Sequence, residues 1–226
     1  MGILYTVATP IGNKEDITYR GVRILKLVDI IACEDTRQTA KLLKRYDIEA
    51  KMISCHQHSH NAKIDQIVEM LKTGKDVALV SDAGTPAVSD PGAELILVAI
   101  KNKIRVVPIP GVSAVTTISS ISGNKSGKFL FLGFLPKKKG RQTLLKNIKT
   151  QMSKAKFDVS IIIYESPHRL VKTLKDFAEI GDWQVVVGRE MTKKFEEIIR
   201  GNIKDIIEKL KDKKIKGEIS LCLSRE

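Results

Sequence analysis

The first half of the chain alternates short apolar runs with segments of helical periodicity, and this alternation restricts the fold more than any other feature. The apolar runs, each of the length of a buried strand, occupy residues 3–8, 29–33, 51–55, 76–80 and 104–107. The segments between them place apolar residues three and four positions apart, as in residues 64–71, which is the spacing of an amphipathic helix. Strands that alternate with helices predict βαβ units, and therefore a mostly parallel, doubly wound α/β sheet.

A polar motif follows each of these strands. The motifs read TPIGN, EDTR, HQHSH, SDAGTP and PGVSA in chain order. The carboxyl ends of parallel strands meet at one edge of a sheet, and open α/β sheets bind their ligands outside that edge. Because charged residues, glycine and proline gather after every strand, we predict a ligand site at this edge.

The longest of these loops, residues 80–92, is rich in residues that expose the backbone. It contains two Gly, two Pro, two Asp and three hydroxyl residues, so a ligand could approach its backbone closely. It lacks the Lys-Ser/Thr pair of a phosphate-binding loop, and Asp82 and Asp90 would repel a polyanion. The loop predicts either a ligand that is neutral or carries a positive centre, or a tight strand-to-helix turn with nothing bound.

Glycine and polar residues interrupt the pattern at residues 123–127, where we expect a domain boundary. The prediction is an N-terminal α/β domain at 1–122 and a C-terminal α/β domain at 123–226. Strand-like runs of the second half lie at residues 129–135, 159–164, 184–190, 196–200 and 219–223. Helical patterns separate some of these runs, and we expect a mixed sheet with helices.

The net charge of +13 and a sequence pI near 9.6 favour a polyanionic partner such as nucleic acid. A lysine-rich surface without a specific partner is the alternative. No apolar run approaches the roughly 20 residues that span a bilayer, and the first residues lack the pattern of a signal peptide. The cysteines, Cys33, Cys55 and Cys222, are scattered, so we expect reduced thiols, a cytoplasmic protein and no membrane partner.

Seven motifs in a fixed order carry a resemblance to a known family. They read TPIGN, DIIACEDTR, VALVSDAGTPAVSDPG, PGVSA, FLGFLP, YESPHRL and GREMTK, and they extend over about residues 4–223. The set resembles the tetrapyrrole methylase superfamily and, within it, the small-subunit (16S) ribosomal RNA cytidine-2′-O-methyltransferase family. The EDTR, YESPHR and GREMTK motifs are similar to the ribosomal RNA branch rather than to the porphyrin and corrin enzymes.

This resemblance implies two α/β domains with S-adenosylmethionine in a cleft between them, and a homodimer. By motif position it implies cofactor contacts at Pro10, Asp82, Ala83, Gly84, Thr85, Pro86, Val88, Ser89, Ser113, Ala114, Phe134, Leu135 and Pro136. The sulfonium cation of this cofactor suits an acidic, backbone-rich loop, and the cofactor carries no phosphate that would need a basic cradle. The sequence departs from the family at Gln57, Ser59 and Val112, where the family usually has Glu, Asn and Pro.

Methyl transfer to a ribose hydroxyl is an in-line displacement, so the oxygen, methyl and sulfur must be held in line. Because a 2′-OH is a weak nucleophile, a base or a cation near the oxygen should help. Glu34 or Asp35 could accept the proton, and Arg37, Arg189 or Lys193 could bind a phosphate or stabilise the forming oxyanion. Two other roles stay open for the EDTR motif: the start of a helix, with acids near its positive end, or RNA positioning.

The polar residues of the remaining motifs are candidates for RNA contact. They are His56, His58, Glu165, Ser166, His168, Arg169, Arg189 and Glu190. The histidines of residues 56–60 could instead belong to a solvated loop or chelate a metal. No Cys or carboxylate has strong ligand spacing to them and sulfonium chemistry needs no metal, so we expect none. For the other candidates the alternatives are a helix start at Ser-Pro and an Arg–Glu ion pair that braces a turn.

We therefore expect an S-adenosylmethionine-dependent enzyme that methylates the 2′-oxygen of a cytidine in small-subunit ribosomal RNA. Aromatic residues make up only 5% of the chain and offer few surfaces for base stacking. Recognition by shape, backbone and one extruded nucleotide, within the assembled subunit, is therefore expected. Two other functions stay open: a methyltransferase for a small tetrapyrrole-type molecule, and a non-enzymatic RNA-binding or assembly factor.

Overall fold

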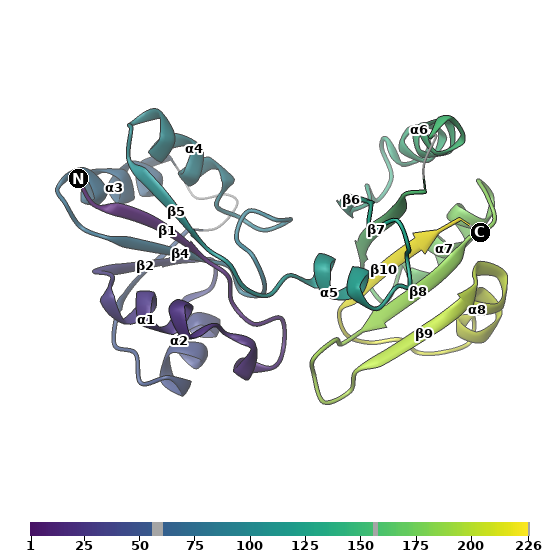
Figure 1. Ribbon diagram of the computed structural model, residues 1–226, viewed down its shortest axis with the longest axis horizontal. Helices are drawn as coiled ribbons and strands as arrows, with labels where there is room; N and C mark the ends of the chain where they lie inside the picture. Colours follow the sequence, from purple (N-terminus) through teal and green to yellow (C-terminus); the bar gives the residue numbers. More distant parts are fainter. Residues whose placement is uncertain (56–60, 156–157, 226) are drawn as a thin grey trace. The chain divides into compact units, whose positions relative to one another are not determined.

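The computed structural model describes residues 1–55, 61–155 and 158–225 (Figure 1). The chain forms two compact units, Met1–Ser113 and Ala114–Glu226. The division precedes the boundary expected after residue 122, because helix α5 (Ala114–Ser120) belongs to the second unit.

The first unit is a sheet of five parallel strands covered by helices on both faces. Its strands are β1 (Ile3–Val7), β2 (Ile30–Cys33), β3 (Lys51–Ser54), β4 (Val77–Val80) and β5 (Arg105–Ile109). Its helical segments are η1 (Lys14–Asp16), α1 (Tyr19–Leu27), α2 (Thr36–Arg45), α3 (Asn61–Lys72) and α4 (Ala93–Lys101). The strand order is β3-β2-β4-β1-β5, and every pair is parallel. The predicted parallel, doubly wound sheet is confirmed.

Along each strand the side chains point alternately to the two faces of the sheet, and apolar side chains form a separate layer on each face. Leu25 of α1 and Leu43 of α2 pack on the face that contains Val7 and Val80. Helices α3 and α4 pack on the opposite face, which contains Leu4. Consequently the chain leaves the neighbouring strands β1 and β4 toward opposite faces of the sheet. Open α/β sheets bind ligands at such a point.

The second unit is a mixed five-stranded sheet, as expected. Its strands are β6 (Phe129–Phe134), β7 (Ser160–Glu165), β8 (Gln184–Arg189), β9 (Glu197–Asn202) and β10 (Ile219–Ser224), in the order β6-β7-β10-β8-β9. Strands β6 and β7 are parallel, and the other pairs are antiparallel. Its helices are α5, α6 (Arg141–Lys154), α7 (Leu170–Ala178) and α8 (Ile203–Leu210).

Three of these helices, α6, α7 and α8, cover one face of the second sheet. Phe177 and Trp183 are fully buried there, with their rings in an edge-to-face arrangement. Helix α5 approaches the sheet at Gly188, where an added Cβ would lie 2.8 Å from Cδ1 of Ile118. This contact explains why the division between the units falls before α5. The part of the chain that the structure describes contains no helix long and apolar enough to cross a membrane.

Candidate active site

The loops after β1 and β4 are joined by a short antiparallel bridge. The backbone N–H of Thr9 donates to Gly84 O at 2.9 Å, and the N–H of Gly84 donates to Thr9 O at 3.0 Å. The buried hydroxyl of Thr9 donates to Ser81 O at 3.0 Å, and the Ser81 hydroxyl donates to Gly84 O at 3.0 Å. The polar groups of both loops are thus paired at the point where the topology predicts a ligand.

The loop after β4 turns sharply, with four residues in the left-handed backbone region. Two are Gly84 (φ 84°) and Gly92 (φ 121°), and two are Ala87 (φ 64°) and Ser89 (φ 63°), which have a Cβ. A left-handed conformation costs a residue with a Cβ about 1–2 kcal/mol. Strain of this kind concentrates at ligand sites, because the surrounding structure must hold it in place.

A cavity of about 370 Å³ lies beside the second half of this loop, within the first unit. Its lining includes Ala87, Ser89 and Asp90, together with Leu95 of α4. The volume is within the range of small-molecule sites, about 300–1,000 Å³. Of the predicted cofactor contacts, Ser89 lines this cavity.

The loop after β5 is held to the loop after β4. The hydroxyl of Thr85 donates to Val112 O at 3.1 Å. Gly111 is needed for a close approach, since a Cβ there would lie 3.0 Å from Cβ of Ala8. The predicted contacts Gly84 and Thr85 are therefore brought together with the loops that contain Thr9 and Val112.

The EDTR motif starts helix α2, as one of its interpretations predicted. Asp35 is the N-cap, and its carboxylate accepts from the backbone N–H of Arg37 at 2.8 Å. The same carboxylate accepts from Nε and Nη2 of Arg37, at 3.0 and 2.7 Å. The backbone N–H of Asp35 donates to Oδ1 of Asp82 at 3.1 Å, which joins this motif to the loop after β4.

These contacts make Asp35 a poor proton acceptor. The hydrogen bonds from the Arg37 side chain and backbone lower the pKa of Asp35 to about 2. A carboxylate with so low a pKa is a weak base at neutral pH. Glu34 is half-buried beside it, and its role as general base stays a prediction.

In the second unit, the YESPHRL motif contributes to a buried polar network. The Glu165 side chain is 0% exposed, and its carboxylate accepts from the Ser166 N–H (2.6 Å), the Thr173 hydroxyl (2.6 Å) and two nitrogens of Arg169 (2.7 and 2.9 Å). The Thr173 hydroxyl in turn accepts from Nη2 of Arg141 at 2.8 Å.

The network continues to Asp176 and to the segment after β6. Arg141 pairs with Asp176 at 2.7 Å, and both side chains are nearly buried. Nη2 of Arg169 donates to Leu135 O at 2.9 Å, and Nη1 of Arg141 donates to Pro136 O at 3.2 Å. The two guanidinium groups therefore fix the backbone of the segment predicted to contact the cofactor.

This geometry refines several predicted roles. The carboxylate of Glu165 is enclosed by its partners, so the geometry gives it a bracing role, and its substrate contact stays a prediction. Leu135 is 2% exposed within the core and its carbonyl accepts from Arg169, so its contact with the cofactor stays a prediction. The Phe134 side chain is 59% exposed, and its ring packs edge-to-face on Tyr164. His168 is exposed.

The GREMTK motif lies at the end of β8, and its charges are paired. Arg189 pairs with Glu197 at 2.9 Å. Lys193 pairs with Glu190 at 3.0 Å and with Glu218 at 2.9 Å. Burial alone would lower the pKa of Lys193, but hydrogen bonds to the two carboxylates outweigh it and raise this pKa. Lys193 therefore stays a cation, as its proposed role requires.

Some predicted residues remain without a structural account. His56 and His58 lie outside the described residues. Among the residues that are described, no group of three or more His, Cys, Asp or Glu side chains could hold a metal ion. Contact of the remaining candidates with cofactor or RNA stays a prediction.

Sequence reasoning missed several residues that hold the site together. Thr9 and Ser81 stood in the recognised motifs, but their hydrogen bonds to Gly84 depend on strand order. Thr173 and Asp176 belong to no motif that was singled out. Arg141 ends the basic run of residues 137–141, which suggested a solvated face or a phosphate contact, whereas its side chain is buried and paired with Asp176. Thr173 and Asp176 are three residues apart in α7, so they lie on one face of that helix. This spacing was the feature of the sequence that could have pointed to them.

Comparison with known proteins identifies the class. Residues 3–207 match the family described as Tetrapyrrole (Corrin/Porphyrin) Methylases. The chain therefore belongs to the tetrapyrrole methylase family.

Relatives narrow the class further. A protein of Thermotoga maritima named Ribosomal RNA small subunit methyltransferase I is 44% identical over 225 residues, which are 99% of this chain and 99% of that protein. The protein of the same name from Bacillus subtilis is 47% identical over 99% of this chain and 75% of its own length. Within the methylase family, the chain groups with these ribosomal RNA small subunit methyltransferases.

Solved structures share the fold at low sequence identity. Diphthine synthase has a TM-score of 0.73 at 14% identity, over 98% of this chain and 90% of that chain. Cobalt precorrin-4 methyltransferase has a TM-score of 0.70 at 20% identity, over 98% and 94%. A uroporphyrin-III C-methyltransferase from Thermus thermophilus, complexed with S-adenyl homocysteine, has a TM-score of 0.66 at 14% identity, over 98% and 97%. These structures confirm the fold class.

The buried network makes a prediction about stability. Glu165→Gln should lower the free energy of unfolding of the second unit by about 3–5 kcal/mol, because it leaves the largely buried Arg169 guanidinium without its carboxylate partner. The matched control is Glu197→Gln, whose partly exposed ion pair with Arg189 should be worth about 1 kcal/mol or less. Urea unfolding followed by the fluorescence of Trp183, which is the single tryptophan and is buried in this unit, measures both. Equal losses would contradict the assignment of a bracing role to Glu165.

The depressed pKa of Asp35 predicts a pH dependence. Asp35→Asn removes the ion pair with Arg37 but keeps a residue that can cap α2. The folded pKa of about 2 lies below the ordinary value, so the ion pair stabilises the fold above about pH 4 and is lost as the pH falls through about 2. The thermal midpoint of the variant should lie below that of the wild type by a constant amount near neutral pH. This gap should close between about pH 4 and pH 2, and a gap that persists at the acid end would contradict the prediction.

Proposed function

We propose that this protein transfers a methyl group from S-adenosylmethionine to the 2′-oxygen of a cytidine in small-subunit ribosomal RNA. The observation that carries the proposal is the 44% identity, over 99% of both chains, to the Ribosomal RNA small subunit methyltransferase I of Thermotoga maritima. We further propose that the enzyme acts on the assembled subunit, as a cytoplasmic homodimer.

The loop geometry of the first unit fits the cofactor. The tight bridge between Thr9 and Gly84 fixes the backbone of this loop, and a Cβ on the buried Gly84 would lie 3.4 Å from Cγ2 of Ile11 and 3.8 Å from Val112 O. Asp82 is exposed at the same loop and offers a negative charge to a sulfonium centre. We propose cofactor contacts at Pro10, Asp82, Ala83, Gly84, Thr85, Pro86, Val88, Ser89 and Ser113 in the first unit, and at Ala114, Phe134, Leu135 and Pro136 in the second.

When bound, S-adenosylmethionine supplies an electrophilic methyl group, so the protein has to orient the ribose hydroxyl and take its proton. We propose Glu34 as the proton acceptor. Asp35 and Arg37 position the start of α2 beside it, through the cap and the ion pair already described. Lys193 is proposed as the cation that stabilises the forming oxyanion or a neighbouring phosphate.

The distribution of charge supports RNA as the substrate class. The second unit has 24 Lys and Arg against 13 Asp and Glu, a net charge of +11, whereas the first unit has 15 against 13, a net charge of +2. Phosphate contacts dominate the affinity of proteins for nucleic acids. We propose that the second unit provides most of these contacts, with His168, Arg169 and Arg189 among them and Ser166 and Glu190 beside them.

A small tetrapyrrole-type substrate is the main rival, because the fold is shared with enzymes for such molecules. The identity to those enzymes is 20% or less, against 44–47% to the ribosomal RNA enzymes. A non-enzymatic binding role is disfavoured by the enzyme class of these relatives.

The deciding experiment measures transfer of a labelled methyl group from S-adenosylmethionine. The acceptors are small ribosomal subunits that lack the modification, protein-free small-subunit RNA and a porphyrin precursor. We expect label on a cytidine ribose, with more label on subunits than on free RNA. Label on the porphyrin precursor alone would move the assignment to the rival class. The absence of transfer despite cofactor binding would favour an assembly role.

The central loop makes a second prediction. Gly84→Ala should weaken S-adenosylmethionine binding by at least tenfold, because a Cβ at φ 84° strains and shifts the backbone of the site. Gly74→Ala is the matched control, since Gly74 has φ 95°, nothing within 4 Å of an added Cβ, and lies before β4 at the other edge of the sheet. Both variants should lose stability, but only the first should lose affinity in isothermal titration calorimetry. Equal affinity in the two variants would remove the loop from the site.

A further inference from the structure

The loop between β8 and β9 exposes an aromatic side chain to solvent. Phe195 is 67% exposed in a chain that has only six phenylalanines, and it lies at the turn of the hairpin that β8 and β9 form (Figure 1). Burial in the core would normally remove such a ring from water. Because single exposed apolar residues are common on protein surfaces, the exposure of Phe195 counts only together with the features of the loop around it.

The loop that carries Phe195 is held rigidly by polar contacts at its base. The backbone N–H of Glu190 donates to Glu218 O at 2.9 Å, and the N–H of Thr192 donates to Oε2 of Glu196 at 2.6 Å. The N–H of Glu196 donates to Lys193 O at 3.0 Å. The loop thus holds its shape through its own bonds, which lowers the entropy cost of binding through it.

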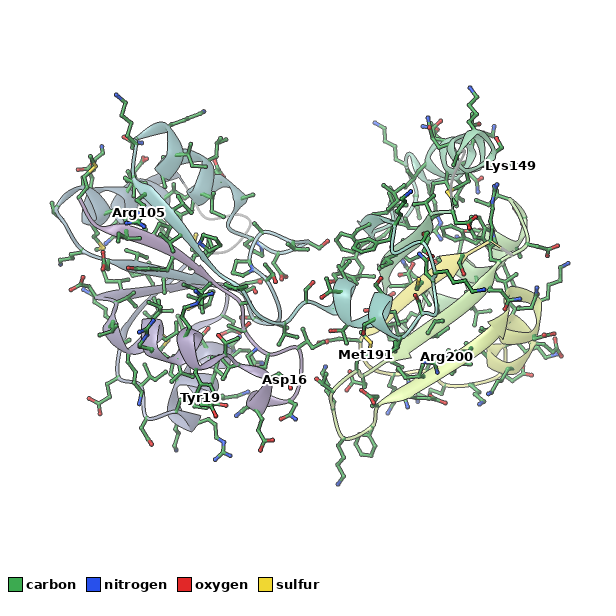
Figure 2. The ribbon with its side chains drawn as sticks, viewed as in Figure 1. Asp16, Tyr19, Arg105, Lys149, Met191 and Arg200 are labelled. Carbon is green, nitrogen blue, oxygen red and sulfur yellow. The ribbon has the colours of Figure 1, made fainter. Side chains whose placement is uncertain are left out.

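Backbone strain and a buried anchor fix the same loop. Glu190 and Thr192 have positive φ values of 50° and 66°, although neither is glycine. The side chain of Met191 is buried against Gly188, where an added Cβ would lie 2.6 Å from its sulfur (Figure 2). Strained backbone that is held in this way concentrates at ligand sites.

A lysine lies over the exposed ring, in a unit of net positive charge. Nζ of Lys194 lies over the Phe195 ring, 5.6 Å from its centroid. Lys193, two residues away, is paired with Glu190 and Glu218, and Glu196 follows the ring directly, but the unit as a whole has a net charge of +11. An aromatic face beside lysines is the combination with which proteins bind single-stranded nucleic acids, because the ring stacks on a base and the lysines contact phosphates.

We propose that Phe195 stacks on an unpaired base of the RNA substrate. This inference rests on the proposed function and adds a contact residue to it. The ring supplies one stacking surface in a chain that is poor in aromatic residues. Stacking on a single base tolerates any sequence, so Phe195 contributes affinity and register rather than the choice of base.

Two substitutions at this position test the proposal, with protein-free small-subunit ribosomal RNA as the probe. Phe195→Ala should weaken RNA binding about 5- to 150-fold, the range expected for loss of one stacked base. Its affinity for S-adenosylmethionine and its thermal midpoint should stay at the wild-type values. Phe195→Trp should restore RNA binding, because indole also stacks on bases.

The tryptophan variant also provides a direct optical signal. Trp183 is the single tryptophan of the wild type and is 0% exposed, so RNA should not quench the wild-type emission. A tryptophan at position 195 would be exposed, and stacking on a base should quench it. The control for loss of an exposed ring is Tyr19→Ala: Tyr19 is 98% exposed on α1 of the first unit, and its variant should bind RNA like the wild type (Figure 2).

Unchanged RNA affinity in Phe195→Ala, together with unquenched emission from Phe195→Trp, would overturn the inference. So would a loss of binding to assembled subunits without quenching of the Phe195→Trp emission by those subunits, because the ring would then contact something other than a base. If the wild type itself transfers no methyl group to RNA, the proposed function fails. Wild-type transfer with an unaffected Phe195→Ala variant contradicts this inference alone.

Discussion

The pair of backbone hydrogen bonds between Thr9 and Gly84 holds the first unit's site together. Strands β1 and β4 are neighbours in the sheet but far apart in the chain, and their loops leave toward opposite faces. Without the bridge these loops would separate at the point where ligand contacts are proposed. The hydroxyls of Thr9 and Ser81 donate hydrogen bonds to the carbonyls beside the bridge. These bonds hold the backbone in place where the strained part of the loop begins.

In the second unit, charged side chains hold a loop segment in place. The segment after β6 follows an edge strand and so has a sheet neighbour on one side alone. Arg141 and Arg169 supply the missing hydrogen bonds to Pro136 O and Leu135 O. Each guanidinium is balanced by a carboxylate, Asp176 for the first and Glu165 for the second. Removing any one of these groups would leave a buried charge or carbonyl unpaired, which is why the network acts as a unit.

The fold was largely predictable from the sequence because helical and strand periodicities differ, and apolar residues marked each element. The position of the ligand edge was also predictable, since it follows from parallel strand order. Which charged side chains pair with each other was harder to predict. From the sequence, Glu165 and Arg169 are equally consistent with contacts to the substrate. Only the packing of α6 and α7 shows that they bind each other. The division into compact units falls before α5, because helix packing decides which unit α5 joins, whereas glycine at residue 123 marks a loop.

Ala87 and Ser89 hold left-handed backbone without the glycine that would relax it. Glycine at either position would remove the steric cost of the folded loop but would also widen the range of conformations that the loop can reach. Ala87 and Ser89 therefore lower the thermal stability somewhat, but they restrict the loop to fewer conformations. Selection for higher thermal stability would not easily change these two positions. A mutation that relieves the strain also loosens the surface that the cofactor is proposed to use.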